Sequence, residues 1–179
     1  AILRYIGRRS RDGKYTNVYP GNEYETARID AVLALDDDCF TGLVVHNYKA
    51  RFGFDFLADE EKYCDELASV RANLANTIFP RHLASLERSI SKEGEYLASQ
   101  EFPSVADFNW MPRLQYIANL DFIDDQFLSP FPKLKAAYEA FFELPRVKRY
   151  YMQNGGVVPD SYESEPYDDY QRLELFFEK

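Results

Sequence analysis

Asp30 is the acidic side chain whose position is hardest to explain by solvation alone. It lies in the segment RIDAV (28–32), on the apolar side of an expected helix and close to Ala27 and Ala31. A carboxylate in such surroundings needs a partner, because burying an unpaired charge is costly. Two roles stay open for Asp30: a salt bridge inside a helical bundle, or an acceptor for the ammonium group of a ligand or a cation of a partner chain.

Ser104 and Asp107 have the spacing of a helix capping box, ahead of the apolar residues Phe108, Trp110 and Met111. In a capping box the serine hydroxyl can accept from the amide of the acidic residue, here Asp107, and the carboxylate of Asp107 can reach back to the amide of Ser104. We therefore interpret Asp107 as a folding device that stabilises the start of a helix, and assign it no catalytic role.

The remaining reactive side chains do not have the spacing of a known type of site. Glycine-rich phosphate loops, metal-ligand pairs and nucleophile elbows are absent from the sequence, so no residue is assigned to catalysis or to a metal. We expect the following: a solvated helix face for 36–38, surface or core positions for His46 and His82, and buried reduced thiols for Cys39 and Cys64.

Composition narrows the class of protein. The chain has 179 residues, 46% of them apolar, and a net charge of -9. This fits one domain with a real core, or one domain plus a tail. An acidic chain is a poor nucleic-acid ligand, because the phosphate backbone repels it. No apolar run approaches the roughly 18 residues that a membrane span needs. We expect a soluble protein of a reducing, cytoplasmic compartment.

Helical periodicity dominates the chain, and no strand is expected beyond residues 157–158. The first long helix begins at Glu23 and is predicted to bury side chains at steps of four from Ala27 to Leu43. The next is predicted from Asp59 to about Lys92, with a kink or restart at Pro80. Three further helices are expected, the first after Ser104 and the others over 132–144 and 145–153.

The two ends of the chain differ from its middle. Residues 1–9 form a short helix with one apolar stripe, Ile2, Tyr5 and Ile6, which must pack on something. A stretch rich in Gly, Pro and Asn follows, which is typical of a linker. From 157 onward the chain is acidic and rich in tyrosine. The predicted organisation is a remnant helix at 1–9, a linker at 10–22, a helical domain at 23–155 and a tail at 156–179.

Four segments in this order resemble the C-terminal half of a cytosolic glutathione transferase. They are AILRYIGR at 1–8, YPGNEYETARIDAV at 19–32, the stretch from Tyr96 to Asp107, and FPKLKAAYEAFFELPRVKRYY at 131–151. The resemblance covers about 1–153 and looks closest to the mu, pi and sigma classes. It implies an all-α bundle of about five helices, preceded by the last helix of a thioredoxin-like domain. The family motif usually has a glycine where Ser99 or Gln100 stands, and an aliphatic residue at Pro103.

What the resemblance implies about function follows from the family. Asp30 matches a carboxylate that, in related classes, reaches across a dimer to the γ-glutamyl ammonium of glutathione, the co-substrate. The first long helix, with or without the tail, would line the pocket for a hydrophobic electrophile. The group that activates the thiol lies in the thioredoxin-like domain, which would precede Ala1.

Two hypotheses about function follow. In the first, the chain is the helical part of a glutathione transferase, a homodimer that conjugates glutathione to hydrophobic electrophiles. In the second, the helical domain serves as a non-catalytic scaffold or interaction module in a larger complex, and the acidic tail at 157–179 docks on a basic partner through its tyrosines.

Overall fold

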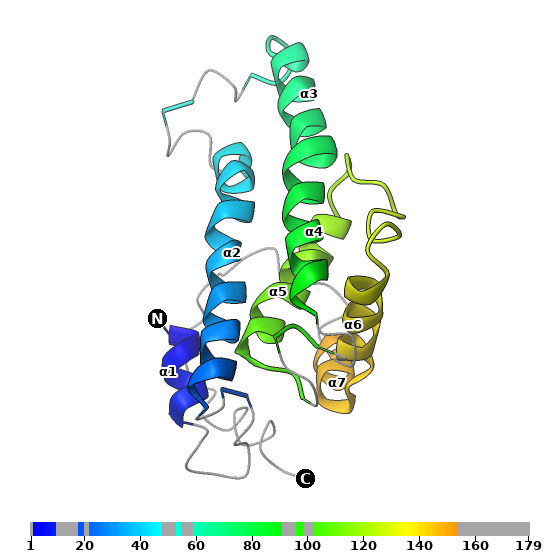
Figure 1. Ribbon diagram of the computed structural model, residues 1–179. Helices are drawn as coiled ribbons and strands as arrows, with labels where there is room; N and C mark the ends of the chain where they lie inside the picture. Colours follow the sequence, from blue (N-terminus) through cyan, green and yellow to red (C-terminus); the bar gives the residue numbers. More distant parts are fainter. Residues whose placement is uncertain are drawn as a thin grey trace, which may run out of the picture. The chain divides into compact units, whose positions relative to one another are not determined.

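The computed structural model describes residues 2–9, 18–19, 22–47, 53–54, 59–90, 96–98 and 102–153. All regular structure in these residues is helical, which confirms the predicted all-α class (Figure 1). The chain divides into two compact units, Ala1–Phe141 and Phe142–Lys179. The helices are α1 (Ile2–Arg9), α2 (Glu23–Asn47), α3 (Cys64–Asn73), η4 (Leu74–Ile78), α4 (Phe79–Ser89), α5 (Val105–Ala118), α6 (Pro132–Glu143) and α7 (Pro145–Gln153).

Helix α2 begins at Glu23 as predicted, but its buried face differs from the predicted one. Ala27 and Ala31 are exposed. Steps of four residues drift by about 40° each around a helix of 3.6 residues per turn, so they cannot follow one face for long. The observed face alternates steps of three and four, and its buried apolar residues are Ile29, Val32, Leu33, Cys39, Phe40 and Leu43.

Helices α3 and α4 run on as one rod through η4, a π-helical turn (Figure 1). This rod begins at Cys64, whereas the prediction placed its start at Asp59. The expected irregularity near Pro80 takes the form of η4, after which Pro80 occupies the first turn of α4. The π-helical turn shifts the backbone hydrogen bonds by one residue, so that the amide of Phe79 donates to the oxygen of Leu74, and Pro80, which has no amide proton, follows directly after this shift.

Helix α5 fills the centre of the first unit. Trp110, Met111, Leu114 and Ile117 are fully buried on it. The indole Nε1 of Trp110 donates a hydrogen bond of 2.9 Å to the backbone oxygen of Val32, which ties α5 to the middle of α2. Pro112 lies inside this helix, where the sequence predicted a bend.

The start of α6 is stabilised by a side chain from α4. The carboxylate of Glu87 accepts hydrogen bonds from the amides of Lys133 and Leu134, at 3.2 and 2.8 Å. A carboxylate is favourable at a helix N-terminus because it satisfies free amides and opposes the helix dipole. The described part of the second unit holds the end of α6 and all of α7, in which the rings of Phe142 and Tyr151 meet edge to face at 5.0 Å.

Candidate functional site: the Asp30 network

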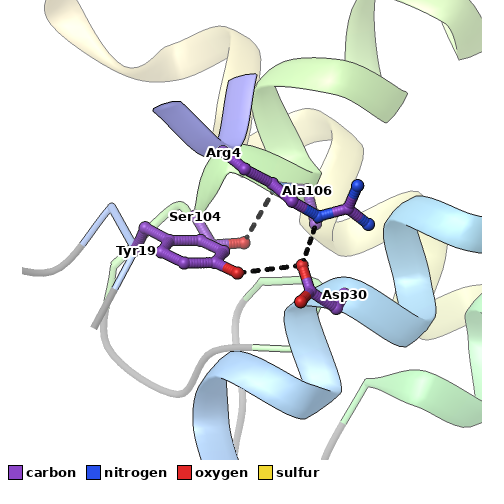
Figure 2. A network of polar contacts seen from close by, with 5 residues as sticks. All are labelled: Arg4, Tyr19, Asp30, Ser104 and Ala106. Carbon is purple, nitrogen blue, oxygen red and sulfur yellow. Dashed lines mark hydrogen bonds and ion pairs between the residues drawn. The ribbon is translucent and has the colours of Figure 1, made fainter. Parts of the chain in front are cut away.

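Asp30 joins three segments that are distant in sequence. Nε of Arg4, on α1, donates to Oδ1 of Asp30, on α2, at 2.6 Å. The hydroxyl of Tyr19 donates to the same oxygen at 2.9 Å. Figure 2 shows the guanidinium and the phenol approaching the carboxylate from two directions. Of the two roles left open by the sequence, the structure contains the internal salt bridge.

The ion pair between Arg4 and Asp30 is partly exposed to solvent. The side chains of Arg4 and Asp30 are 37% and 38% exposed, so water weakens the attraction between them. The hydrogen bond to Asp30 raises the pKa of Arg4. Both interactions fall on Oδ1, and within the described part of the chain no hydrogen bond or ion pair to Oδ2 is found.

Tyr19 is held by close packing against α1 and the start of α5. Its side chain is fully buried, and the guanidinium of Arg8 lies 5.7 Å from the ring centroid. Gly7 makes this approach possible: a Cβ at this position would lie 2.7 Å from Cβ of Tyr19 and 2.8 Å from Cγ1 of Val105. The amide of Val105 also donates to the oxygen of Val18 at 2.9 Å. The face of α1 that carries Arg4, Gly7 and Arg8 therefore packs on Tyr19 and on the rest of the first unit.

The other face of α1 has no cover in the described part of the chain. Ile2, Tyr5 and Ile6 are 76%, 65% and 55% exposed. They are the apolar stripe that the sequence predicted must pack on something. Apolar side chains that cluster on one face of a helix and stay exposed are typical of an interface with another structural unit.

Asp107 forms the predicted capping box at the start of α5. Oδ2 accepts from the amide of Ser104 at 2.7 Å, and the serine hydroxyl accepts from the amide of Ala106 at 3.2 Å. The second oxygen, Oδ1, accepts from the amide of Leu97 at 2.8 Å, which the spacing of the motif did not predict. The carboxyl is fully buried, and burial raises its pKa to about 7.

Asp36 corrects the prediction of a solvated face at 36–38. It is buried, and Oδ2 lies 3.0 Å from Nη1 of Arg113 on α5. Burial is the main cause that raises the pKa of Asp36, and the charge of Arg113 opposes it. The same guanidinium lies 4.7 Å from the ring centroid of Phe40. Asp36 follows Val32 by four residues and precedes Phe40 by four, and both of these are buried, so Asp36 lies in the middle of the buried face of α2.

The two cysteines differ in their exposure to solvent. Cys39 is buried as predicted, and burial raises its pKa to about 12. Cys64 is exposed at the start of α3, so the prediction for it was wrong. In the described residues no group of three or more His, Cys, Asp or Glu side chains could hold a metal ion. His82 is partly buried and the side chain of His46 lies outside the described set.

Sequence reasoning missed both partners of Asp30. Arg4 was part of a helix expected to belong to another unit, and Tyr19 was part of a stretch interpreted as a linker. The available signal was the apolar pair Val18 and Tyr19 inside an otherwise polar stretch, since such a pair is unusual in a solvated linker. The predicted tail at 156–179 lies outside the described residues.

Comparison with known proteins agrees with this fold. The family described as glutathione S-transferase, C-terminal domain, matches residues 56–154. No curated protein sequence gives a significant match. In the part of the chain that the structure describes, no helix is both long and apolar enough to cross a membrane.

Solved structures of the family superpose on most of the chain. Prostaglandin synthase D of Nilaparvata lugens has a TM-score of 0.61 at 17% identity, over 85% of this chain and 65% of that one. The pi-class glutathione S-transferase of Onchocerca volvulus has a TM-score of 0.57 at 23% identity, over 87% of this chain and 64% of that one. The glutathione S-transferase of Ascaris lumbricoides has a TM-score of 0.55 at 25% identity, over 85% of this chain and 65% of that one.

This chain thus spans less than two thirds of the length of each of these three proteins. The family match, in contrast, extends over more than half of the chain. The match includes two of the four motifs quoted above, the stretch from Tyr96 to Asp107 and the segment 131–151, and it agrees with the all-helical architecture. The chain therefore belongs to the glutathione S-transferase family and contains its C-terminal helical domain.

Proposed function

We propose that this chain is the helical part of a glutathione transferase, which conjugates glutathione to hydrophobic electrophiles in the cytoplasm. In this reaction the glutathione thiolate attacks the electrophile, and a leaving group departs or the electrophile takes up a proton. The hydroxyl group that stabilises the thiolate would lie in a thioredoxin-like domain outside this chain. We further propose that the protein is a homodimer of the mu, pi and sigma group.

The exposed stripe of α1 is the observation that carries this proposal. Ile2, Tyr5 and Ile6 point away from the helical unit, although the opposite face of α1 is tightly packed on it. A helix packed on one side and apolar on the other is suited to lie between two structural units. The proposed borders follow: α1 closes a preceding domain, 10–22 connect it, 23–155 form the helical domain, and 156–179 form a tail.

The test of this function is an assay of the polypeptide extended upstream of Ala1. Common domain sizes suggest an extension of about 65–80 residues. With 1-chloro-2,4-dinitrobenzene as electrophile, we expect formation of the thioether with release of chloride. A folded, extended protein that neither conjugates nor binds glutathione would contradict the proposal and would leave the scaffold hypothesis.

For Asp30 we propose a contact to the γ-glutamyl ammonium of the glutathione bound by the partner protomer. The side chain is 38% exposed, and both internal contacts use Oδ1. Oδ2 is thus the oxygen proposed to accept from the ammonium. A charge-assisted hydrogen bond of this kind contributes about 1.5–3 kcal/mol.

Three variants of the extended protein separate this contact from a purely structural role. Asp30→Asn is expected to raise KM for glutathione roughly tenfold to a hundredfold with little change in kcat, because a lost ground-state contact acts on binding. Glu25→Gln, an exposed position on the same helix, should leave KM unchanged. Arg4→Met removes the internal ion pair while it keeps the carboxylate.

The two roles predict different patterns. If Asp30 binds the ammonium, only Asp30→Asn changes KM strongly. If Asp30 serves only as the partner of Arg4, then Asp30→Asn and Arg4→Met lower the free energy of unfolding by similar amounts, and neither changes KM. The second pattern would overturn the proposed contact without affecting the transferase assignment.

A further inference from the structure

Helix α7 is a basic surface in an acidic protein. The whole chain carries a net charge of -9, yet α7 contains Arg146, Lys148 and Arg149 and no acidic residue. Lys148 and Arg149 are exposed. A local positive field of this kind attracts an acidic ligand, and it acts over short distances because salt screens charges beyond a Debye length of about 10 Å.

Apolar contact area accompanies the charge on α7. Met152 is 74% exposed, and Tyr150 is also exposed, with its ring 5.5 Å from that of Tyr151. Aromatic and methionine side chains beside basic groups are typical of the centre of a binding surface. In the described residues 142–153 the one acidic side chain is Glu143, which lies 2.7 Å from Lys148.

The chain that follows α7 has the complementary composition. Residues 154–179 contain seven acidic side chains against two basic ones. Five of the acidic residues fall within 160–170, together with three tyrosines: they are Asp160, Glu163, Glu165, Asp168 and Asp169, with Tyr162, Tyr167 and Tyr170. Both the charge and the aromatic content of this segment match what α7 exposes.

Chain length permits the two segments to meet. The nine residues of α7 extend about 14 Å at 1.5 Å per residue, a distance that about four extended residues can span. The six residues 154–159, which include Gly155 and Gly156, separate α7 from the acidic segment. A ligand tethered this closely has an effective concentration of the order of millimolar, so even a weak attraction suffices for docking.

We propose that the acidic, tyrosine-bearing segment 160–170 folds back and docks on the basic face of α7 in the same chain. Its carboxylates meet Lys148 and Arg149, and its rings pack beside Tyr150 and Met152. This contact places the tail and α7 in competition with outside partners. A basic protein that binds the tail must first displace it from α7, and an anionic ligand of α7 must displace the tail.

Zero-length cross-linking with a carbodiimide tests the contact on the full 179-residue chain. We expect Lys148 to form intramolecular amide bonds with carboxylates of 160–170, in a product of monomer mass. The bond between Lys148 and Glu143 serves as the positive control, because these groups already form an ion pair.

Salt and charge reversal decide whether the contact is electrostatic. The cross-links from Lys148 to the tail should fall several-fold between about 0.05 and 1 M salt, because the Debye length shortens to about 3 Å. Arg149→Glu should have the same effect, and adding Asp168→Arg and Asp169→Arg should restore the yield. Arg88→Glu, on α4, is the matched control and should change nothing.

Two results would overturn the proposal. The first is a Lys148 that reacts with Glu143 but never with 160–170. The second is a tail bond found only in products of dimer mass and lost on dilution, which would assign the tail to a second copy. Amide hydrogen exchange gives an independent measure: release of the tail by Arg149→Glu should speed exchange in α7, and unchanged exchange rates would contradict docking.

Discussion

The buried carboxylate of Asp107 accepts a hydrogen bond from the amide of Leu97, ten residues earlier in the chain, at 2.8 Å. The same side chain caps α5 through Ser104. One carboxyl group therefore fixes both the start of the central helix and the segment 96–98 that leads toward it. The loss of this group removes two kinds of support at once.

Asp107→Ala should lower the free energy of unfolding by about 2–4 kcal/mol. The helix loses its cap, and the amides of Leu97 and Ser104 lose their acceptor in the protein interior. Urea denaturation followed by circular dichroism measures the change. Asp125→Ala, at an exposed position, is the control and should stay within about 0.5 kcal/mol of the parent protein.

The same group should make stability depend on pH. Burial raises the pKa of Asp107 to about 7, above the value of about 4 expected in the unfolded chain. Between pH 4 and 7 the folded state binds more protons than the unfolded state. The contribution of Asp107 to the free energy of unfolding is therefore complete below pH 4 and is lost as the pH rises through 7.

The geometry accommodates the protonated form. The single proton of the Ser104 hydroxyl faces two acceptors, Oδ2 of Asp107 at 2.9 Å and the oxygen of Leu97 at 3.3 Å. A protonated carboxyl can donate to the serine, which is then free to donate to Leu97. Subtracting the pH profile of Asp107→Asn from that of the parent isolates this group. A difference that is flat from pH 4 to 7 would show that the carboxyl is already ionised in the folded state.

Gly7→Ala should loosen α1 from the helical unit. The added methyl would lie within 2.8 Å of both Tyr19 and Val105, so the helix must shift, at a cost of about 1–3 kcal/mol. Faster hydrogen exchange over α1 and a lower denaturation midpoint are expected. Ile6→Ala, on the exposed face of the same helix, should change the midpoint much less; equal effects of the two substitutions would argue against the tight packing at Gly7.

The two thiols should differ in reactivity. Cys64 is exposed, whereas Cys39 is buried with its pKa raised to about 12, and only the thiolate form is nucleophilic. Iodoacetamide followed by peptide mass spectrometry should find Cys64 alkylated and Cys39 intact in the folded protein. Both should react in denaturant, which confirms that each peptide can be detected.

The helices could be predicted from the sequence because their signals are local. The capping residue Ser104 and Pro145, at the first position of α7, each fix a helix start within one residue. The predicted helix start at Asp59 was wrong because acidic residues favour the first turn of a helix but do not determine which residue begins it.

The Asp30 network could not be predicted, because its partners come from separate segments. The contact of Arg4 with Asp30 spans 26 residues, and that of Tyr19 spans 11. The burial of Asp36 likewise depends on Arg113, a residue of another helix. Pairings of this kind follow from how the helices pack and not from the periodicity within any one of them. Leu74 and Phe79 show the same limit inside one rod: both are buried, but they are five residues apart, a spacing that the three- and four-residue steps of an α-helix do not give.

The spacing between Leu74 and Phe79 equals the length of η4, so the widened turn accommodates one more residue than an α-helical turn would. Side chains on α3 are consequently rotated by about 100° from the direction that an uninterrupted α-helix would give them. Leu67 reaches the core on α3 while Leu83 and Leu86 reach it on α4. The one additional residue in η4 thus sets which side of α3 faces the core. Deletion of one residue from η4 would turn Leu67 outward toward water.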